Sequence, residues 1–256
     1  MGSVEYRHES MRMSYVKGED SSFKMMRFEP CDYHSMIQRQ TAFEPFVIKT
    51  AESTASPMEG CGSFPSVWDG APCEMVENNE KGLTLKYLKR NGTMEITVRL
   101  DFIEGANVIR QTNTVKNISK NPITLTHFSS GLICGIGMGG KLNRWDDCKI
   151  KVHYCLSHWC GEAQWREASL EDVGIYKQSM HNWDMSSYRI SSTGTWSTGK
   201  YYPLMMVEDL ECGEIWYLEH EGASNWTMEL GCLNDCGEVK HKAVGAVKPR
   251  KDLEKP

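Results

Sequence analysis

Residues 82–102 read GLTLKYLKRNGTMEITVRLDF. Apolar and polar side chains alternate through Leu83–Leu88 and again through Met94–Phe102, which is the pattern of two half-buried strands. The Asn91-Gly92 pair between them is typical of a tight turn, because both central residues of such a turn need a positive φ. This stretch therefore predicts an antiparallel β-hairpin.

The same alternation recurs along the chain, whereas long helical periodicity is scarce. Val108–Lys116 and Ile123–Ser129 alternate on either side of a polar turn at Asn117–Pro122. Further alternating stretches are CKIKVHYCL from Cys148, YRISS from Tyr188, EIWYLEH from Glu214 and SNWTMELGCL from Ser224. Turns come about every 8–12 residues, which is the spacing found in sandwiches and barrels. We therefore expect an all-β fold.

Length and charge limit the class of protein. The chain has 256 residues, of which 40% are apolar, and a formal net charge of −5. The negative charge argues against binding to nucleic acid or to an anionic membrane. No apolar run approaches the roughly 18 residues that span a bilayer, and the first residues lack a secretory signal pattern. We expect a cytoplasmic protein with neither nucleic acid nor membrane among its partners.

The ten cysteines show no regular spacing. No pair has the C-x-x-C spacing, and Cys155/Cys160 and Cys232/Cys236 are too loose for a zinc site. The eight histidines form no H-E-x-x-H motif and no metal pair at i and i+4. We expect reduced, unbridged thiols, no metal and no cofactor.

Tryptophan is abundant, with eight residues in the chain. Large aromatic side chains fill a sandwich core well, which is one interpretation. Trp159, Trp165 and Trp196, however, lie in polar segments rich in turn residues. These three are candidates for an exposed aromatic platform, because sugars present C–H faces that pack on indole rings. Both interpretations stay open at this point.

Three segments resemble, in the same order, the N-terminal domain of glycoside hydrolase family 36, which contains α-galactosidases. They are CLSHWCGEAQWREASLEDVGI (155–175), GTWSTGKYYPLMMVED (194–209) and EIWYLEHEGASNWTMELG (214–231). The first holds a Trp-x-x-Glu segment at Trp159–Glu162, and the third a Trp-x-Met-Glu segment at Trp226–Glu229. The stretch NVIRQTNTVKNISKNPITLTHFSSG, residues 107–131, is also similar to that domain.

The resemblance implies a β-supersandwich of two large antiparallel sheets with few short helices, as in galactose mutarotases. We expect residues 1–245 to form this single domain and residues 246–256 to be a polar tail or a truncated linker. In the family, a (β/α)₈ barrel follows this domain and carries two catalytic aspartates. Residues 231–256 are too few for a barrel of about 250 residues. We therefore expect the barrel to lie outside this chain, and the chain alone to be inactive.

One segment is similar to the nucleophile motif of that barrel. Trp183-Asp184-Met185 matches it in part, but Asn182 and Ser186 stand where the family has lysine and asparagine. The segment is polar on both sides, whereas the family's aspartate ends a buried barrel strand. NRWDDCK, residues 143–149, fails for the same reason. The sequence therefore predicts no catalytic residues, because glycosidases require a pair of carboxylates.

The resemblance places the Trp-x-x-Glu segment where the domain meets the barrel. Alternation stops after Leu156, so we expect Trp159, Glu162 and Trp165 to project from a loop rather than from a strand. We expect these three residues to bind substrate, a galactoside-like carbohydrate. The other partners implied are the catalytic barrel of a full-length protein and a second copy in a homo-oligomer.

The alternative is a stand-alone carbohydrate-binding or mutarotase-like protein. Galactose mutarotases need a glutamate base and histidine acids that converge in one cleft. His127, His153, His158 and Glu162 are the residues available for these roles.

Overall fold

The computed structural model describes residues 2–19, 21–31, 43–51, 71–89, 92–133, 150–175, 186–194, 196–210 and 213–232. Within these ranges the regular elements are all strands, and no helix occurs. All pairings between these strands are antiparallel. The predicted all-β fold of antiparallel sheets is thereby confirmed. The described part of the chain contains no helix long and apolar enough to cross a membrane.

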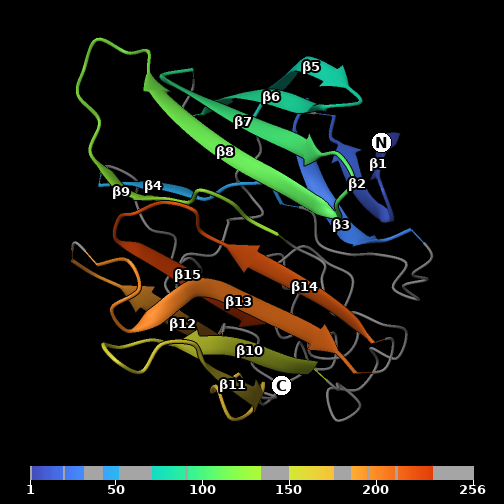
Figure 1. Ribbon diagram of the computed structural model, residues 1–256. Coiled ribbons are helices and arrows are strands. Elements are labelled where there is room, and N and C mark those ends of the chain that lie inside the picture. The colour runs from blue at the N-terminus through green and yellow to red at the C-terminus, as the bar shows by residue number, and fades with distance from the viewer. Residues whose placement is uncertain are drawn as a thin grey trace, which may run out of the picture. The chain divides into compact units, whose positions relative to one another are not determined.

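Strands β1 to β9 belong to one compact unit. Its three-stranded sheet has the order β1 (Gly2–His8), β2 (Met11–Lys17), β3 (Phe23–Pro30). Its four-stranded sheet, whose ribbons lie next to one another in Figure 1, has the order β5 (Cys73–Asn79), β6 (Gly82–Lys89), β7 (Met94–Ile103), β8 (Val108–Asn117). β4 (Ile48–Thr50) pairs with β9 (Leu125–Phe128) in a separate two-stranded sheet. β9 is shorter than the strand expected at Ile123–Ser129.

The hairpin predicted around Gly92 is confirmed as β6 and β7. Gly92 has a φ of 79°, and its N–H donates a hydrogen bond to the Lys89 carbonyl at 3.1 Å. Leu83 lies opposite Leu100, and Tyr87 lies opposite Ile96. Since side chains alternate between the faces of a sheet, this register puts the apolar residues of both strands on one face.

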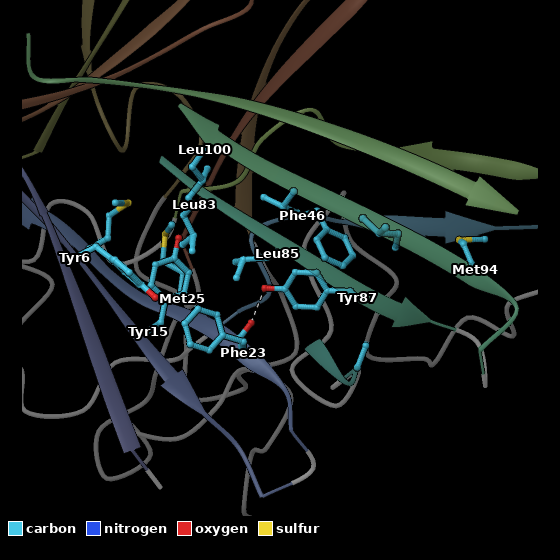
Figure 2. Packing of buried hydrophobic residues seen from close by; sticks show 14 residues of the cluster. Tyr6, Tyr15, Phe23, Met25, Phe46, Leu83, Leu85, Tyr87, Met94 and Leu100 are labelled. Atoms are coloured by element: carbon cyan, nitrogen blue, oxygen red, sulfur yellow. Dashed lines mark hydrogen bonds between the residues drawn. The ribbon is translucent and has the colours of Figure 1, made fainter. Parts of the chain in front are cut away.

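That face forms the core of the first unit. Leu85, Tyr87 and Ile96 are fully buried there, together with Tyr15 and Phe23 from the three-stranded sheet. Figure 2 shows the Tyr87 hydroxyl donating a hydrogen bond to the Phe23 carbonyl, at 2.8 Å. The rings of Tyr15 and Phe23 stack with centroids 4.8 Å apart. Each of these large side chains contributes about 1.5–3 kcal/mol through burial, so the two sheets hold together mainly by this layer.

The turn between β1 and β2 is attached to the turn between β7 and β8. The imidazole Nε2 of His8 lies 2.9 Å from the carbonyl oxygens of both Ile103 and Ala106. The Ser10 N–H donates to Asn107 Oδ1 at 3.1 Å. These bonds join segments almost a hundred residues apart in the sequence.

Strands β10 to β15 belong to a second compact unit. Its four-stranded sheet has the order β11 (Gln164–Ser169), β10 (Ile150–Leu156), β13 (Tyr201–Asp209), β14 (Glu214–Glu219). β12 (Ser186–Ser192) pairs with β15 (Trp226–Cys232). The core of this unit consists of Val152, Ile190, Met205, Trp226 and Met228. It therefore draws on both sheets of the unit.

Each unit is compact by itself. The expectation that residues 1–245 form a single domain stays a prediction. The tail at residues 246–256 lies outside the described residues.

Candidate functional site

The segment that joins β10 to β11 presents the first of the expected site residues. His158 and Gly161 close a turn through two backbone hydrogen bonds, from Gly161 N–H to the His158 carbonyl at 2.9 Å and in the reverse direction at 3.4 Å. Cys160, the third residue of the turn, has a φ of 59°. A type II turn needs a positive φ at this position, where glycine is usual. The turn leaves the Trp159 side chain 76% exposed.

Trp159 contacts a second exposed indole, that of Trp196. Their ring centroids are 5.8 Å apart and the ring planes meet at 67°, an edge-to-face arrangement. Trp196 is 51% exposed and lies in the segment between β12 and β13. Two distant segments of the second unit thus build one aromatic pair, which we call the indole pair.

Hydrogen bonds fix the segment that carries Trp196. The Ser192 hydroxyl donates to the Trp196 carbonyl at 3.0 Å, and the buried Trp226 indole N–H donates to the Ser197 carbonyl at 2.6 Å. The segment that carries Trp159 is joined to it, because Ser157 N–H donates to the Lys200 carbonyl at 2.9 Å. The indole pair is therefore an exposed apolar surface on a firmly held backbone.

Glu162 lies in the same turn region, as expected. Its carboxylate Oε1 accepts a hydrogen bond from the Cys160 N–H at 3.2 Å, and its side chain is exposed. No hydrogen bond joins the second carboxylate oxygen to another described residue, so it can accept one from a hydroxyl or amide donor of a ligand. Glu162 follows Trp159 closely in the sequence and is the carboxylate residue nearest in sequence to the indole pair.

Trp165 differs from the expectation that it projects from a loop. It lies in β11, where it pairs with Cys155 of β10, and its side chain is 51% exposed. The residues around it in β11 are nearly all polar, so this strand at the edge of the sheet shows no alternation that the sequence could reveal. Of the three candidate indoles, the structure pairs Trp159 with Trp196.

The described tryptophans divide into buried and exposed residues. Trp216 and Trp226 are buried, whereas Trp159, Trp165 and Trp196 are exposed. Trp145 and Trp183 lie outside the described residues, as do Asp184 and residues 143–149. The expected binding role of Trp159, Glu162 and Trp165 stays a prediction.

Two of the histidines considered for a mutarotase-like site, His153 and His127, lie in different units of the chain. His153 in β10 pairs with Glu208 in β13, with Nε2 2.8 Å from Oε2. Beside it, Lys151 donates to Glu167 at 2.8 Å, which holds the pKa of the Glu167 carboxyl below its ordinary value. His127 belongs to β9 of the first unit. Among the described residues no group of three or more His, Cys, Asp or Glu side chains could hold a metal ion.

The fold and the site thus define an all-β protein with an exposed indole pair at one sheet. The chain matches no family model and no curated protein. Its structure is similar to that of the α-galactosidase from Lactobacillus brevis, with 10% sequence identity and a TM-score of 0.49, over 82% of this chain and 31% of that chain. It is also similar to a GH36 α-galactosidase from Geobacillus stearothermophilus, with 9% identity and a TM-score of 0.46, over 82% of this chain and 32% of that chain.

The chain spans about a third of the length of these two enzymes.

Proposed function

We propose that this chain acts as a non-catalytic N-terminal β-sandwich domain of an α-galactosidase-like glycoside hydrolase. It supports a catalytic barrel, and the indole pair with Glu162 and Trp165 contacts that barrel or the sugar bound in it. The order of the three sequence segments supports the family. The observation that carries the role of the site is the indole pair itself, which is exposed although its backbone is fixed by hydrogen bonds.

An exposed indole pair on an ordered backbone favours binding to a partner that covers it. Burying a large apolar side chain contributes about 1.5–3 kcal/mol, so a partner that covers Trp159 and Trp196 gains affinity. Because the backbone beneath them is already ordered, little conformational entropy is lost on binding. A sugar ring offers C–H groups to an indole face and hydroxyl groups to the Glu162 carboxylate. A barrel surface offers apolar side chains to the same indoles.

The first test is activity. We expect the purified chain to show no turnover of an aryl α-galactoside, and we expect turnover once an α-galactosidase barrel is fused to it. Turnover by the chain alone that disappears in Asp184→Asn would contradict the proposal.

The second test addresses the site. In the fusion with a barrel, Trp159→Ala and Trp196→Ala should raise KM for the galactoside or weaken the docking of the two domains, measured as the separation of their unfolding transitions. Ile118→Ala removes an exposed apolar side chain from the first unit and should change neither quantity. Unchanged kinetics and unchanged docking in both tryptophan variants would remove the site from the proposal.

Titration of the chain alone with methyl α-galactoside, followed by tryptophan fluorescence, separates the two occupants. A saturable change that is lost in Trp159→Ala indicates direct sugar contact and favours the stand-alone carbohydrate-binding alternative. The absence of any change leaves the barrel as the occupant.

We further propose that the protein works in the cytoplasm and that nucleic acid and membranes are not partners, in line with its net charge of −5.

A further inference from the structure

Strand β14, Glu214–Glu219, lies at the end of the four-stranded sheet of the second unit, and its one sheet partner in the described part of the chain is β13. Its sequence, EIWYLE, contains no proline and no lysine. It pairs with β13 in continuous register, without a bulge. Ile215, Tyr217 and Leu218 are exposed apolar side chains on this strand. Edge strands are ordinarily protected by charges, proline, bulges or a cover. β14 has its two carboxylates at its ends, Glu214 and Glu219, and no charge, proline or bulge between them.

The opposite edge of the same sheet shows the contrast. β11 carries Arg166 and Glu167 at its centre, and Glu167 is held in an ion pair with Lys151. Charged side chains on an edge oppose pairing with another strand. The two edges of one sheet therefore differ in their suitability for a partner.

The backbone of β14 fixes which groups face outward. His220 N–H donates to the Pro203 carbonyl at 2.8 Å, which continues the β13–β14 register by one pair. In an antiparallel ladder, alternate residues direct both N–H and C=O to the same neighbour. Since His220 faces β13, the residues Ile215, Tyr217 and Glu219 direct their backbone groups away from β13.

We infer that β14 pairs antiparallel with β14 of a second copy of this chain, about a two-fold axis at Tyr217. In this register Trp216 lies beside Leu218 of the other copy, which extends the apolar row on that face. Glu214 lies opposite His220 of the other copy at both ends, so a carboxylate meets a hydrogen-bond donor. No carboxylate opposes a carboxylate, and like charges directly opposite would destabilise the pair.

The size of this contact sets its strength. One short strand on each copy buries less than the about 1,600 Å² of a standard stable interface. The dimer is therefore weak and concentration-dependent, and the sheet it forms runs through both copies. This inference concerns a surface other than the indole pair, and it does not rest on the proposed α-galactosidase role.

The first experiment compares two glutamate variants by sedimentation velocity over a micromolar concentration series. Ile215→Glu places a carboxylate on β14 opposite Glu219 of the other copy, and Val76→Glu places one on β5, an edge strand of the first unit that has a bulge between Met75 and Glu77. The two residues are β-branched and both are 53% exposed, so the variants are matched. We expect dimer formation by the unmodified chain and by Val76→Glu, and loss of the dimer in Ile215→Glu, because like charges directly opposite destabilise a strand pair. A monomer at all concentrations for the unmodified chain, or a dimer that survives Ile215→Glu, would overturn the inference.

The second experiment tests the register by charge exchange. His220→Glu puts two carboxylates opposite each other and should weaken the dimer. Adding Glu214→Lys to that variant restores an attractive pair at both ends and should restore dimer formation. Failure of the double variant to recover would overturn the Tyr217-centred pairing. Far-UV circular dichroism and the melting temperature confirm that each variant is folded.

Discussion

Trp159 and Trp226 are the same residue type in opposite surroundings. Trp159 is 76% exposed, whereas Trp226 is 6% exposed and belongs to the core of the second unit. We expect Trp159→Ala to lower the free energy of unfolding by no more than about 1 kcal/mol, chiefly through the lost ring contact with Trp196. Trp226→Ala should lower it by about 3–5 kcal/mol, because it leaves a cavity. Urea denaturation measures both, and a large loss in Trp159→Ala would show that Trp159 is a core residue.

A buried carboxyl gives the first unit a pH-dependent contribution to stability. Glu44 is 6% exposed, its Oε2 lies 2.5 Å from Lys89 Nζ, and its Oε1 accepts the Ala71 N–H at 2.8 Å. Burial raises the pKa of Glu44 above its ordinary value, and Lys89 opposes this only in part.

A carboxyl whose pKa is higher in the folded state favours folding most when it is protonated. Its contribution is complete below the unfolded pKa of about 4.3 and is lost as the pH rises through the higher folded pKa. Glu44→Gln imitates the protonated form. We therefore expect the unfolding free energy of the unmodified chain, minus that of Glu44→Gln, to fall as the pH rises across the mildly acidic range. A difference that rises with pH would show that attraction to Lys89 outweighs burial.

At the residue scale, the sequence distinguishes core from surface only where a strand alternates. Trp226, Met228 and Leu230 are alternate residues of one strand and face the same side of the sheet. The burial of Trp226 could therefore be predicted from this alternation. The exposure of Trp159 could also be expected, because alternation stops before it. The pairing of Trp159 with Trp196 could not, since it depends on two segments more than thirty residues apart that meet through the order of strands in a sheet.

At the scale of elements, the turn at His158–Gly161 carries strain that a substitution can release. Cys160 adopts a φ of 59°, which is unfavourable by about 1–2 kcal/mol for a residue with a Cβ. Cys160→Gly should raise the free energy of unfolding by about 0.5–1 kcal/mol, the gain being reduced by the greater freedom of glycine in the unfolded chain. Cys160→Ala removes the same thiol but keeps the Cβ, and should leave stability nearly unchanged. Equal effects of the two substitutions would mean that backbone strain is not the cause.

Strands with one buried face were predictable, and strands at sheet edges were less so. β6, β7 and β8 fall within one residue of the expected bounds. In β6 and β7 the inward side chains are apolar, whereas β8 turns Gln111 and Asn113 inward together with Ile109 and Val115. The first part of β11, with Trp165, was expected to be a loop, because the sequence stops alternating after Leu156; its burial pattern in the structure has no regular period either. Backbone hydrogen bonds to β10 are sufficient to make this segment a strand. Such bonds do not depend on the side chains, so the sequence pattern does not reveal them.

At the scale of the whole molecule, the thiols give a test of the expected reducing compartment. Of the ten cysteines, four are described as free: Cys31, Cys73, Cys155 and Cys160. A thiol count under denaturing, non-reducing conditions should approach ten, and a count near zero would show that the compartment is oxidising. In the native protein, exposed Cys160 should react with a thiol reagent before the other three described cysteines. Cys73 should react slowly, because burial raises its pKa to about 11 and the thiolate is the reactive form.

Most strands from β6 onward were readable from the sequence, whereas β1 to β5 were not identified there. The division of the strands into sheets was not readable either. β4 pairs with β9, and β12 pairs with β15, across long intervals of chain. Periodicity identifies a strand and its inward face, whereas its neighbour is selected by the packing of many such faces together. The composition of each sheet therefore emerges only in the folded molecule.

The bond between His8 and the carbonyls of Ile103 and Ala106 has a consequence for biosynthesis. These partners are separated by 95 and 98 residues, and the core layer that joins β2 to β6 and β7 spans a similar interval. A ribosome that adds about 5–20 residues per second needs roughly 5–20 s to make that interval. Throughout this time the hairpin of β1 and β2 exposes the apolar face that carries Met13 and Tyr15, because β6 and β7, which cover this face, have not yet been made. We therefore expect the β1–β2 hairpin to need a chaperone while the protein is being made.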